Sequence, residues 1–166
     1  NDSGCGVFID NTTFTLENSI VSDNTTGLGI AGGIKVEGSI SSLTVNNSTI
    51  SGNSTTGNGG GIAISDISTL VINESTIIGN SADNVGGGIA ALGTLVNISI
   101  TNSTISGNFS TSGGGIFNEG TMIIDSCTIA NNTAVVANGG GVNNIGTGTL
   151  TITNSTISGN LSDASG

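Results

Sequence analysis

Three features of the sequence predict its fold class. An eleven-residue block occurs six times, a glycine cluster followed by Ile or Val recurs once per repeat, and the 3.6-residue apolar spacing of a helix is missing. Together they predict an all-β protein. The expected architecture is a right-handed parallel β-helix (β-solenoid) of about six coils of 24–29 residues, with three short strands per coil.

The block contains the phrase NSTISGN, which appears unchanged at residues 47–53, 102–108 and 154–160. Its first, third and eighth places are apolar in all six copies, so we expect these side chains to face the inside of the stack. The eighth place forms the predicted core ladder: Val21, Ile50, Ile77, Ile105, Ile129 and Ile157. The eleventh place is always Asn and forms the predicted structural Asn ladder: Asn24, Asn53, Asn80, Asn108, Asn132 and Asn160.

We expect the eleventh-place Asn to form a bend in each coil. Asn tolerates the left-handed backbone conformation, and stacked Asn side chains can bond to the amide or backbone of the coil above. Successive Asn residues are 29, 27, 28, 24 and 28 residues apart, so the length changes fall after the Asn, where a loop is expected. A glycine turn and a third strand follow; the turns end at Val7, Ile34, Ile62, Ile89, Ile116 and Val142.

Other repeat folds fit less well. Helical repeats need Ala, Leu, Glu and Lys at helical spacing, and the left-handed hexapeptide solenoid needs a six-residue rhythm; neither is present. With one strand spacing of about 4.8 Å per coil, six coils would be about 29 Å long.

The paired motifs Ile-x-x-Asn (Ile50 to Asn53, Ile105 to Asn108, Ile157 to Asn160) and GGG[IV] resemble the FxxN and GGA[ILV] repeats of polymorphic outer-membrane proteins and related adhesin-like surface proteins. Ile or Val stands where that family has Phe, and Gly where it has Ala. The resemblance covers nearly the whole chain. It implies a secreted passenger or surface stalk, and it brings no catalytic residue.

Charge limits the classes of partner. Eleven acids and one base give a net charge of −10, which repels nucleic acid and anionic lipid headgroups. No apolar stretch approaches the length of about 20 residues that a membrane helix needs, so we expect no membrane insertion by this segment.

We expect no catalytic residues and no cofactor. Polysaccharide lyases of this shape need a basic residue with calcium-binding carboxylates, and hydrolases need clustered acids. Here Lys35 is the only base, and the acids are scattered over different places of the repeat. A polysaccharide-active enzyme is therefore the less favoured class, and incidental Ca²⁺ at loop acids such as Asp83 stays open.

The seventh place predicts an outward hydroxyl row: Thr49, Thr76, Thr104, Thr128 and Thr156. Regular Thr rows on a flat solenoid face can order water, so ice binding is the alternative function. Thr also suits any exposed strand. Ile78 and Ala130 interrupt the Ser row that lies beside it.

Thirteen Asn-x-Ser/Thr sequons occur, and we expect those at the fifth place, Asn47, Asn102 and Asn154, to be the exposed glycosylation candidates. Ladder Asn residues would be poor acceptors if buried. Cys127 stands in the sixth place and is expected to be buried. Cys5 lies in the first glycine turn, four coils away, too far for a disulfide between them.

Residues 1–166 are expected to form a single repeat array, either a segment of a longer protein or a subunit that stacks. The predicted function is a non-catalytic, extracellular or cell-surface solenoid: a stalk, adhesin passenger or filament subunit. Its expected partners are a second copy end to end, neighbouring repeats of the same chain, or glycans and cell surfaces. Adhesion would use the variable loops, such as those at 53–58 and 132–138.

Overall fold

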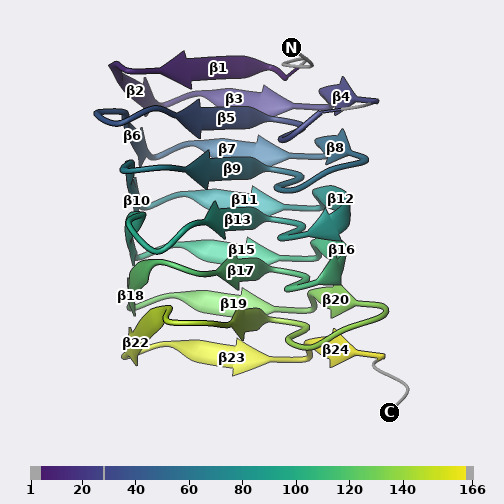
Figure 1. The fold of residues 1–166 in the computed structure, drawn as a ribbon. Coiled ribbons are helices and arrows are strands. Elements are labelled where there is room, and N and C mark those ends of the chain that lie inside the picture. The colour runs from purple at the N-terminus through teal and green to yellow at the C-terminus, as the bar shows by residue number, and fades with distance from the viewer. Residues whose placement is uncertain (1–4, 28, 164–166) are drawn as a thin grey trace.

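The computed structural model describes residues 5–27 and 29–163, which form a stack of coils with the N-terminus at one end and the C-terminus at the other (Figure 1). Each coil contributes one strand to each of four six-stranded parallel sheets. The part of the chain that the structure describes contains no helix. The predicted all-β parallel solenoid of about six coils is confirmed.

The four sheets are named in the order in which the chain reaches them. Sheet A contains β1 (Val7–Asp10), β5 (Ile34–Glu37), β9 (Ile62–Ser65), β13 (Ile89–Leu92), β17 (Ile116–Asn118) and β21 (Val142–Asn144). Sheet B contains β2 (Thr13–Glu17), β6 (Ser42–Asn46), β10 (Thr69–Asn73), β14 (Asn97–Thr101), β18 (Thr121–Asp125) and β22 (Thr149–Thr153). Sheet C contains β3 (Ile20–Ser22), β7 (Thr49–Ser51), β11 (Thr76–Ile78), β15 (Thr104–Ser106), β19 (Thr128–Ala130) and β23 (Thr156–Ser158). Sheet D contains β4 (Thr25–Thr26), β8 (Ser54–Thr55), β12 (Ser81–Val85), β16 (Phe109–Ser112), β20 (Thr133–Ala134) and β24 (Leu161–Ser162).

Sheets A and C run across the view of Figure 1 in opposite directions, with sheet B at the left and sheet D at the right. Equivalent places of successive blocks are paired, as in Leu43 with Leu70 and Ile50 with Ile77. Differences in coil length are absorbed outside the strands of sheets B and C, which keep their register from the first coil to the last.

The expectation of three strands per coil is wrong, because sheet D supplies a fourth. Its strands begin at the residue after the ladder Asn, where we expected a loop. The N–H of Ser54 donates to the carbonyl of Asn24 at 2.9 Å, and the N–H of Ser81 does the same to Asn53. Most of these strands have only two residues, too few to show an alternating pattern in the sequence.

The core is made by the inward residues of sheets A, B and C. Along β6 the odd places Leu43 and Val45 are buried and their neighbours are half-exposed, as expected of a strand with one inward face. The core ladder residues Val21, Ile50, Ile77, Ile105 and Ile129 are buried as predicted. Ile157 is the exception at 53 % exposure, because it lies in the last described coil and has no described coil on its far side.

The glycine turns connect sheet D to sheet A and depend on close backbone approach. Their first residue has a positive φ, which Gly59, Gly86, Gly113 and Gly139 adopt without strain and Ala31 also adopts. The third glycine lies against the Asn ladder: a Cβ on Gly61 would come within 2.7 Å of the Gly88 carbonyl oxygen and 3.2 Å of the Asn80 amide. Gly4 of the first turn lies outside the described residues.

This packing predicts different costs for two glycine-to-alanine changes. Gly61→Ala is expected to lower the free energy of unfolding by about 1–3 kcal/mol, because its methyl group overlaps backbone of the next coil. Gly27→Ala is the control, since a Cβ there meets nothing within 4 Å, and it is expected to leave stability unchanged or raise it by up to about 1 kcal/mol. Urea denaturation of both variants measures the difference, and equal losses would contradict the packing argument.

Candidate functional site

The Asn ladder lies at the junction of sheets C and D. In each internal coil, the Asn side-chain nitrogen donates to the Oδ1 of the next ladder Asn and to the carbonyl of the eighth-place residue of the preceding coil. For Asn80 these bonds are 3.0 Å to Asn108 and 3.0 Å to Ile50. The Oδ1 of Asn80 accepts both the backbone N–H and the Nδ2–H of Asn53, each at 3.0 Å.

One Asn therefore holds three coils together. Asn53, Asn80, Asn108 and Asn132 are buried, and both amide hydrogens and the amide oxygen of each are used. Asn24 and Asn160, in the end coils, are half-buried and continue the same bonds on the side where a described coil adjoins them. The ladder places all six predicted residues in one column.

The expected left-handed conformation of the ladder Asn is wrong. The positive φ angles of this bend belong to the tenth place instead, at Asp23, Gly52, Gly79, Gly107, Asn131 and Gly159. The residue before the ladder Asn thus reverses the chain. This leaves the Asn itself with ordinary backbone geometry and an inward side chain, and Gly is accordingly commonest at the tenth place.

A second ladder, which sequence reasoning missed, runs through the sixth place between sheets B and C. The Oγ of Ser48 accepts the N–H of Ser19 at 3.0 Å and donates to the Asn46 carbonyl at 2.6 Å. The same pattern continues down the stack through Ser75, Ser103, Cys127 and Ser155. The repeated Ser of NSTISGN was the available signal for it.

Cys127 occupies one position of this Ser ladder and is buried, as predicted. Its Sγ accepts the Ser103 N–H at 3.5 Å and lies 3.1 Å from the Asp125 carbonyl. Burial raises the pKa of the Cys127 thiol, and also that of the Cys5 thiol. Both cysteines are free.

The predicted Thr row lies on sheet C with the strands in register. Thr49, Thr76, Thr104 and Thr128 are half-exposed and Thr156 is exposed. Sheet B has a broader hydroxyl-rich outer face, because each of its strands places three residues outward. The sequence reasoning overlooked this face. Its outer positions include Thr13, Thr15, Thr44, Thr69, Ser99, Thr121, Thr149 and Thr151.

The fifth-place asparagines Asn47, Asn102 and Asn154 are exposed and have φ angles of 44°, 50° and 49°. Asn is thus used here for a left-handed bend between sheets B and C, where its short side chain is tolerated. The sequon at this place therefore has a structural explanation of its own. The ladder sequons at Asn53 and Asn108 have no free amide hydrogen.

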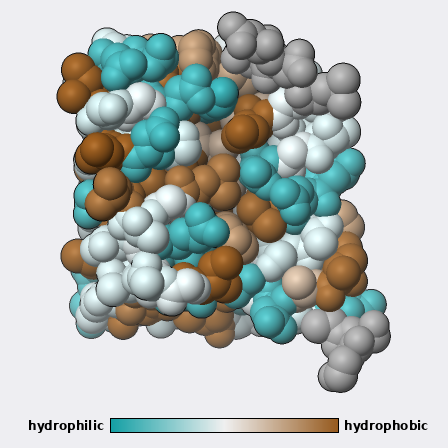
Figure 2. All heavy atoms as spheres, viewed as in Figure 1, coloured by the Kyte–Doolittle hydropathy of each residue, from teal (hydrophilic) through white to brown (hydrophobic). Residues whose placement is uncertain are grey.

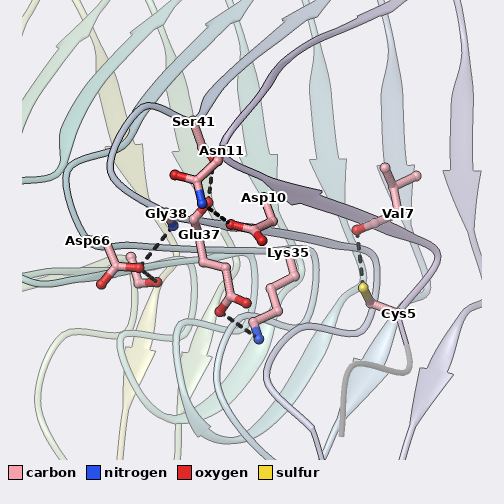
Figure 3. A network of polar contacts seen from close by, with 10 residues as sticks. Cys5, Val7, Asp10, Asn11, Lys35, Glu37, Gly38, Ser41 and Asp66 are labelled. Carbon is pink, nitrogen blue, oxygen red and sulfur yellow. Dashed lines mark hydrogen bonds and ion pairs between the residues drawn. The ribbon is translucent and has the colours of Figure 1, made fainter. Parts of the chain in front are cut away.

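Acidic residues gather at the corner between sheets A and B, where two of them, Asp66 and Glu119, accept backbone N–H groups of an adjacent coil. Figure 3 shows Asp66 and Asn11 on either side of the loop that carries Gly38. Asp66 Oδ2 accepts the Gly38 N–H at 3.0 Å, and Asn11 Oδ1 accepts the Ser39 N–H at 3.0 Å. In a later coil Glu119 Oε2 accepts the Gly93 N–H at 2.9 Å.

Lys35 lies on the outer side of sheet A beside this corner (Figure 3). Its Nζ is 2.8 Å from Glu37 Oε2 and 5.2 Å from the centre of the Phe8 ring, and only 11 % of its side chain is exposed. Lys35, the single basic residue of the sequence, is therefore already paired with a carboxylate and largely covered. Cys5, also drawn in Figure 3, bonds separately to the Val7 carbonyl at 3.1 Å.

Asp125 forms a second polar group, at the corner between sheets B and C. Its Oδ1 accepts hydrogen bonds from Thr153 Oγ1 at 2.6 Å and Asn154 Nδ2 at 2.7 Å, and its Oδ2 accepts one from Ser126 at 3.1 Å. These bonds hold the pKa of the Asp125 carboxyl below its ordinary value. They also fix Asn154, one of the glycosylation candidates.

The variable loops expected to carry adhesion are part of the stack rather than free arms. They lead from sheet D back over the outer side of sheet A. There they cover the outward side chain at the second residue of the strand, so that Ala63 in β9 and Ala90 in β13 are almost fully buried. Successive loops also bond to one another, as in Ala31 N–H to Asn58 at 2.8 Å and Gly59 N–H to Val85 at 2.9 Å. Val136, in the 132–138 loop, is still exposed.

Residues 1–157 match the family model described as right handed beta helix region. The chain belongs to the right-handed β-helix family. This agrees with the parallel stack and with the predicted hand of the coil. Comparisons with curated proteins and with solved structures gave no match.

The polar groups on the outer surface of this β-helix are the hydroxyl rows of sheets B and C, the carboxylates at the corners, and the ammonium group of Lys35, which is paired with Glu37. Within residues 5–27 and 29–163 no three side chains of His, Cys, Asp or Glu gather in a group that could hold a metal ion. In the same part of the chain no helix is long and apolar enough to cross a membrane.

Breaking the Asn ladder is predicted to destabilise the fold strongly. Asn80→Ala leaves the Ile50 carbonyl, the Asn53 amide groups and the Asn108 Oδ1 short of partners in a buried site, and is expected to cost about 3 kcal/mol or more. Asn84→Ala is the control, because Asn84 is exposed and makes a single side-chain bond to Asn58; it should cost less than about 0.5 kcal/mol. Chemical denaturation compares the two, and a small effect at Asn80 would show that the ladder does not carry the stack.

The Asp125 network predicts a pH dependence. Since the pKa of Asp125 is lowered in the folded state, its stabilising effect is complete above the carboxyl's ordinary range and is lost as the pH falls through the folded pKa. Wild type should therefore exceed Asp125→Asn in stability near neutral pH, and the gap should close in acid. Asp83→Asn controls for the loss of a charge, because no described residue bonds to that carboxylate. A gap that stayed constant with pH would contradict the assignment.

Proposed function

We propose that the chain is a non-catalytic structural β-solenoid of an extracellular or cell-surface protein, acting as a stalk, adhesin passenger or filament subunit. The observation that carries the proposal is the continuous pair of Asn and Ser ladders. They run through all six coils and use the most regular places of the repeat for bonds between coils. A surface that holds a fixed shape over its whole length suits a spacer or scaffold.

Catalysis is the competing possibility, because proteins of the β-helix family include polysaccharide-active enzymes. The positions of the acids favour the structural role. Asp66 and Glu119 cap backbone N–H groups, Asp125 binds its neighbours on the next coil, and Glu37 pairs with Lys35. Each of these groups already has a structural partner, and Glu119 and Asp125, which share one coil, lie at different corners of it.

The cell-surface assignment rests on the resemblance to polymorphic outer-membrane proteins and on composition. The chain is strongly acidic, its outer strand positions are rich in Ser and Thr, and its repeats pair an Ile-x-x-Asn motif with a GGG[IV] motif, which resemble the FxxN and GGA[ILV] motifs of that group. Glycans or other cell surfaces are the proposed targets, with the hydroxyl faces of sheets B and C as the contact area in addition to the loops.

In both ladders the backbone N–H of each member donates to the side chain of the next member along the stack. At one end of the described stack Asn24 Oδ1 and Ser19 Oγ accept no bond from the described residues, and at the other the backbone N–H groups of Asn160 and Ser155 donate none to them. These groups are the two halves of the bond that joins every internal pair of coils. A further coil, from the same chain or from a second copy, would complete both ladders.

Negative-stain electron microscopy of the purified chain tests the structural role. Rods or fibres of one constant width are the expected result, with length increasing with concentration if copies stack. Particles without a rod shape would count against the proposal. Assays with pectin-like and other acidic polysaccharides test the competing class, since new reducing ends or unsaturated products would establish an enzyme.

Ice binding is a second candidate that one observation favours. The Thr residues of sheet C pair from Thr49 to Thr156 with no register shift, so five hydroxyl and methyl groups repeat at one strand spacing, about 4.8 Å. Ile78 and Ala130 interrupt the neighbouring row. Thermal hysteresis measures this activity. Thr104→Lys on sheet C should abolish it and Thr44→Lys on sheet B should leave it intact, whereas no hysteresis in the unchanged protein removes the hypothesis.

A further inference from the structure

Three exposed aliphatic side chains form a row at the corner between sheets A and B. Ile40, Ile67 and Leu95 each lie two residues before the first residue of a sheet B strand, and those first residues, Ser42, Thr69 and Asn97, are paired with one another. The three side chains therefore occupy the same place in three successive coils. We name Ile40, Ile67 and Leu95 the corner row.

The corner row is open to solvent although its residues are strongly apolar. Ile40 is 72 % exposed, Ile67 53 % and Leu95 58 %. Beside it lies a shallow hollow of about 420 Å³, lined by Ser39, Asp66, Ile67, Leu92, Thr94 and Leu95. Figure 2 shows brown apolar surface along the left edge of the molecule, the side on which sheet A turns into sheet B.

Acidic residues surround the corner row. In the coil before it the equivalent place is Asn11, which is bonded to Asp10, and in the coil after it the place is Glu119. Asp66 precedes Ile67 directly. The one base of the chain, Lys35, is paired with Glu37, so these other carboxylates have no basic partner within the chain.

We propose that the corner row is a docking site for a basic amphipathic helix of another protein, lying parallel to the solenoid axis. Coils repeat about every 4.8 Å, so Ile40 and Leu95 are about 9.6 Å apart along the axis. A helix presents one side chain per turn to such a surface, and its positions i and i+7 are about 10.5 Å apart. Two turns therefore match three coils closely, and a longer apolar row would lose this register.

Charge selects the character of the helix. Lys or Arg residues flanking its apolar stripe would face Asp10, Asp66 and Glu119. Each carboxylate would then exchange contact with water for contact with a positively charged side chain. A second copy of this chain fits less well, because it would bring the same carboxylates and a net charge of −10 to the contact. The inference holds whether or not the solenoid is a surface stalk.

Fluorescence anisotropy with a designed peptide tests the proposal. The probe is a labelled helical peptide of about 18 residues with Leu at i, i+3, i+7 and i+10 and Lys beside this stripe. It is titrated with the full chain and with Ile67→Ser, Leu95→Ser and Asp66→Asn. Asn at position 66 keeps an oxygen for the Gly38 N–H. Ile20→Ser is the matched control, because Ile20 is 73 % exposed on sheet C, away from this corner.

The expected result is a loss of affinity of about tenfold or more for Ile67→Ser and Leu95→Ser, since each removes one large aliphatic contact. Asp66→Asn should weaken binding several-fold and reduce its sensitivity to salt. The proposal is overturned by an equal loss with Ile20→Ser, or by equal binding of a peptide with Glu in place of Lys. Sedimentation analysis adds another test: self-association abolished by Ile67→Ser would assign the row to a second copy instead.

Discussion

Every part of the structure depends on the side-chain amide of the eleventh-place Asn. A parallel coil forms its backbone bonds with the coils on either side, but the bend between sheets C and D interrupts this ladder. The amide of Asn80 supplies the missing bonds, with its nitrogen reaching both a carbonyl of one neighbouring coil and the amide of the other. A buried amide with all of its donors and acceptors used is stable only if every coil repeats the same geometry.

That requirement explains why the glycine turn accompanies the Asn so regularly. The third glycine of each turn lies against a ladder amide, and a side chain there would push the turn away from the bend. The two sequence motifs, separated by a loop of variable length, are thus in contact in the folded protein. The Ser ladder plays a similar part at the other bend, and Cys127 shows that a sulfur atom can occupy its position.

The places that remain free for function lie outside these ladders. The hydroxyl groups of sheets B and C repeat because the strands repeat, and their usefulness as a binding surface depends on that flat, regular spacing. The corner between sheets A and B is different, because its loops vary in length and sequence between coils. An apolar row limited to three coils, with carboxylates at both ends, is a local feature that the repeat does not require, and this distinguishes it from the scaffold.

The repeated block alone determined the fold class, the coil number, the Asn column and most of the core, because a strict spacing of apolar residues admits few alternatives once strands stack in register. The sequence also predicted a buried Cys127, from its alternation with Ile129, and an exposed Asn47, although both residues lie at the bend between sheets B and C and not in a strand. It did not reveal the two-residue strands of sheet D, which are too short to show a pattern, or the tenth-place residue that takes the left-handed conformation. The sequence analysis also missed the corner row, although Ile40, Ile67 and Leu95 each lie three residues before the first place of their block. The pairing of the sheet B strands brings them into one line, and only the tertiary structure shows that nothing within the described chain covers them.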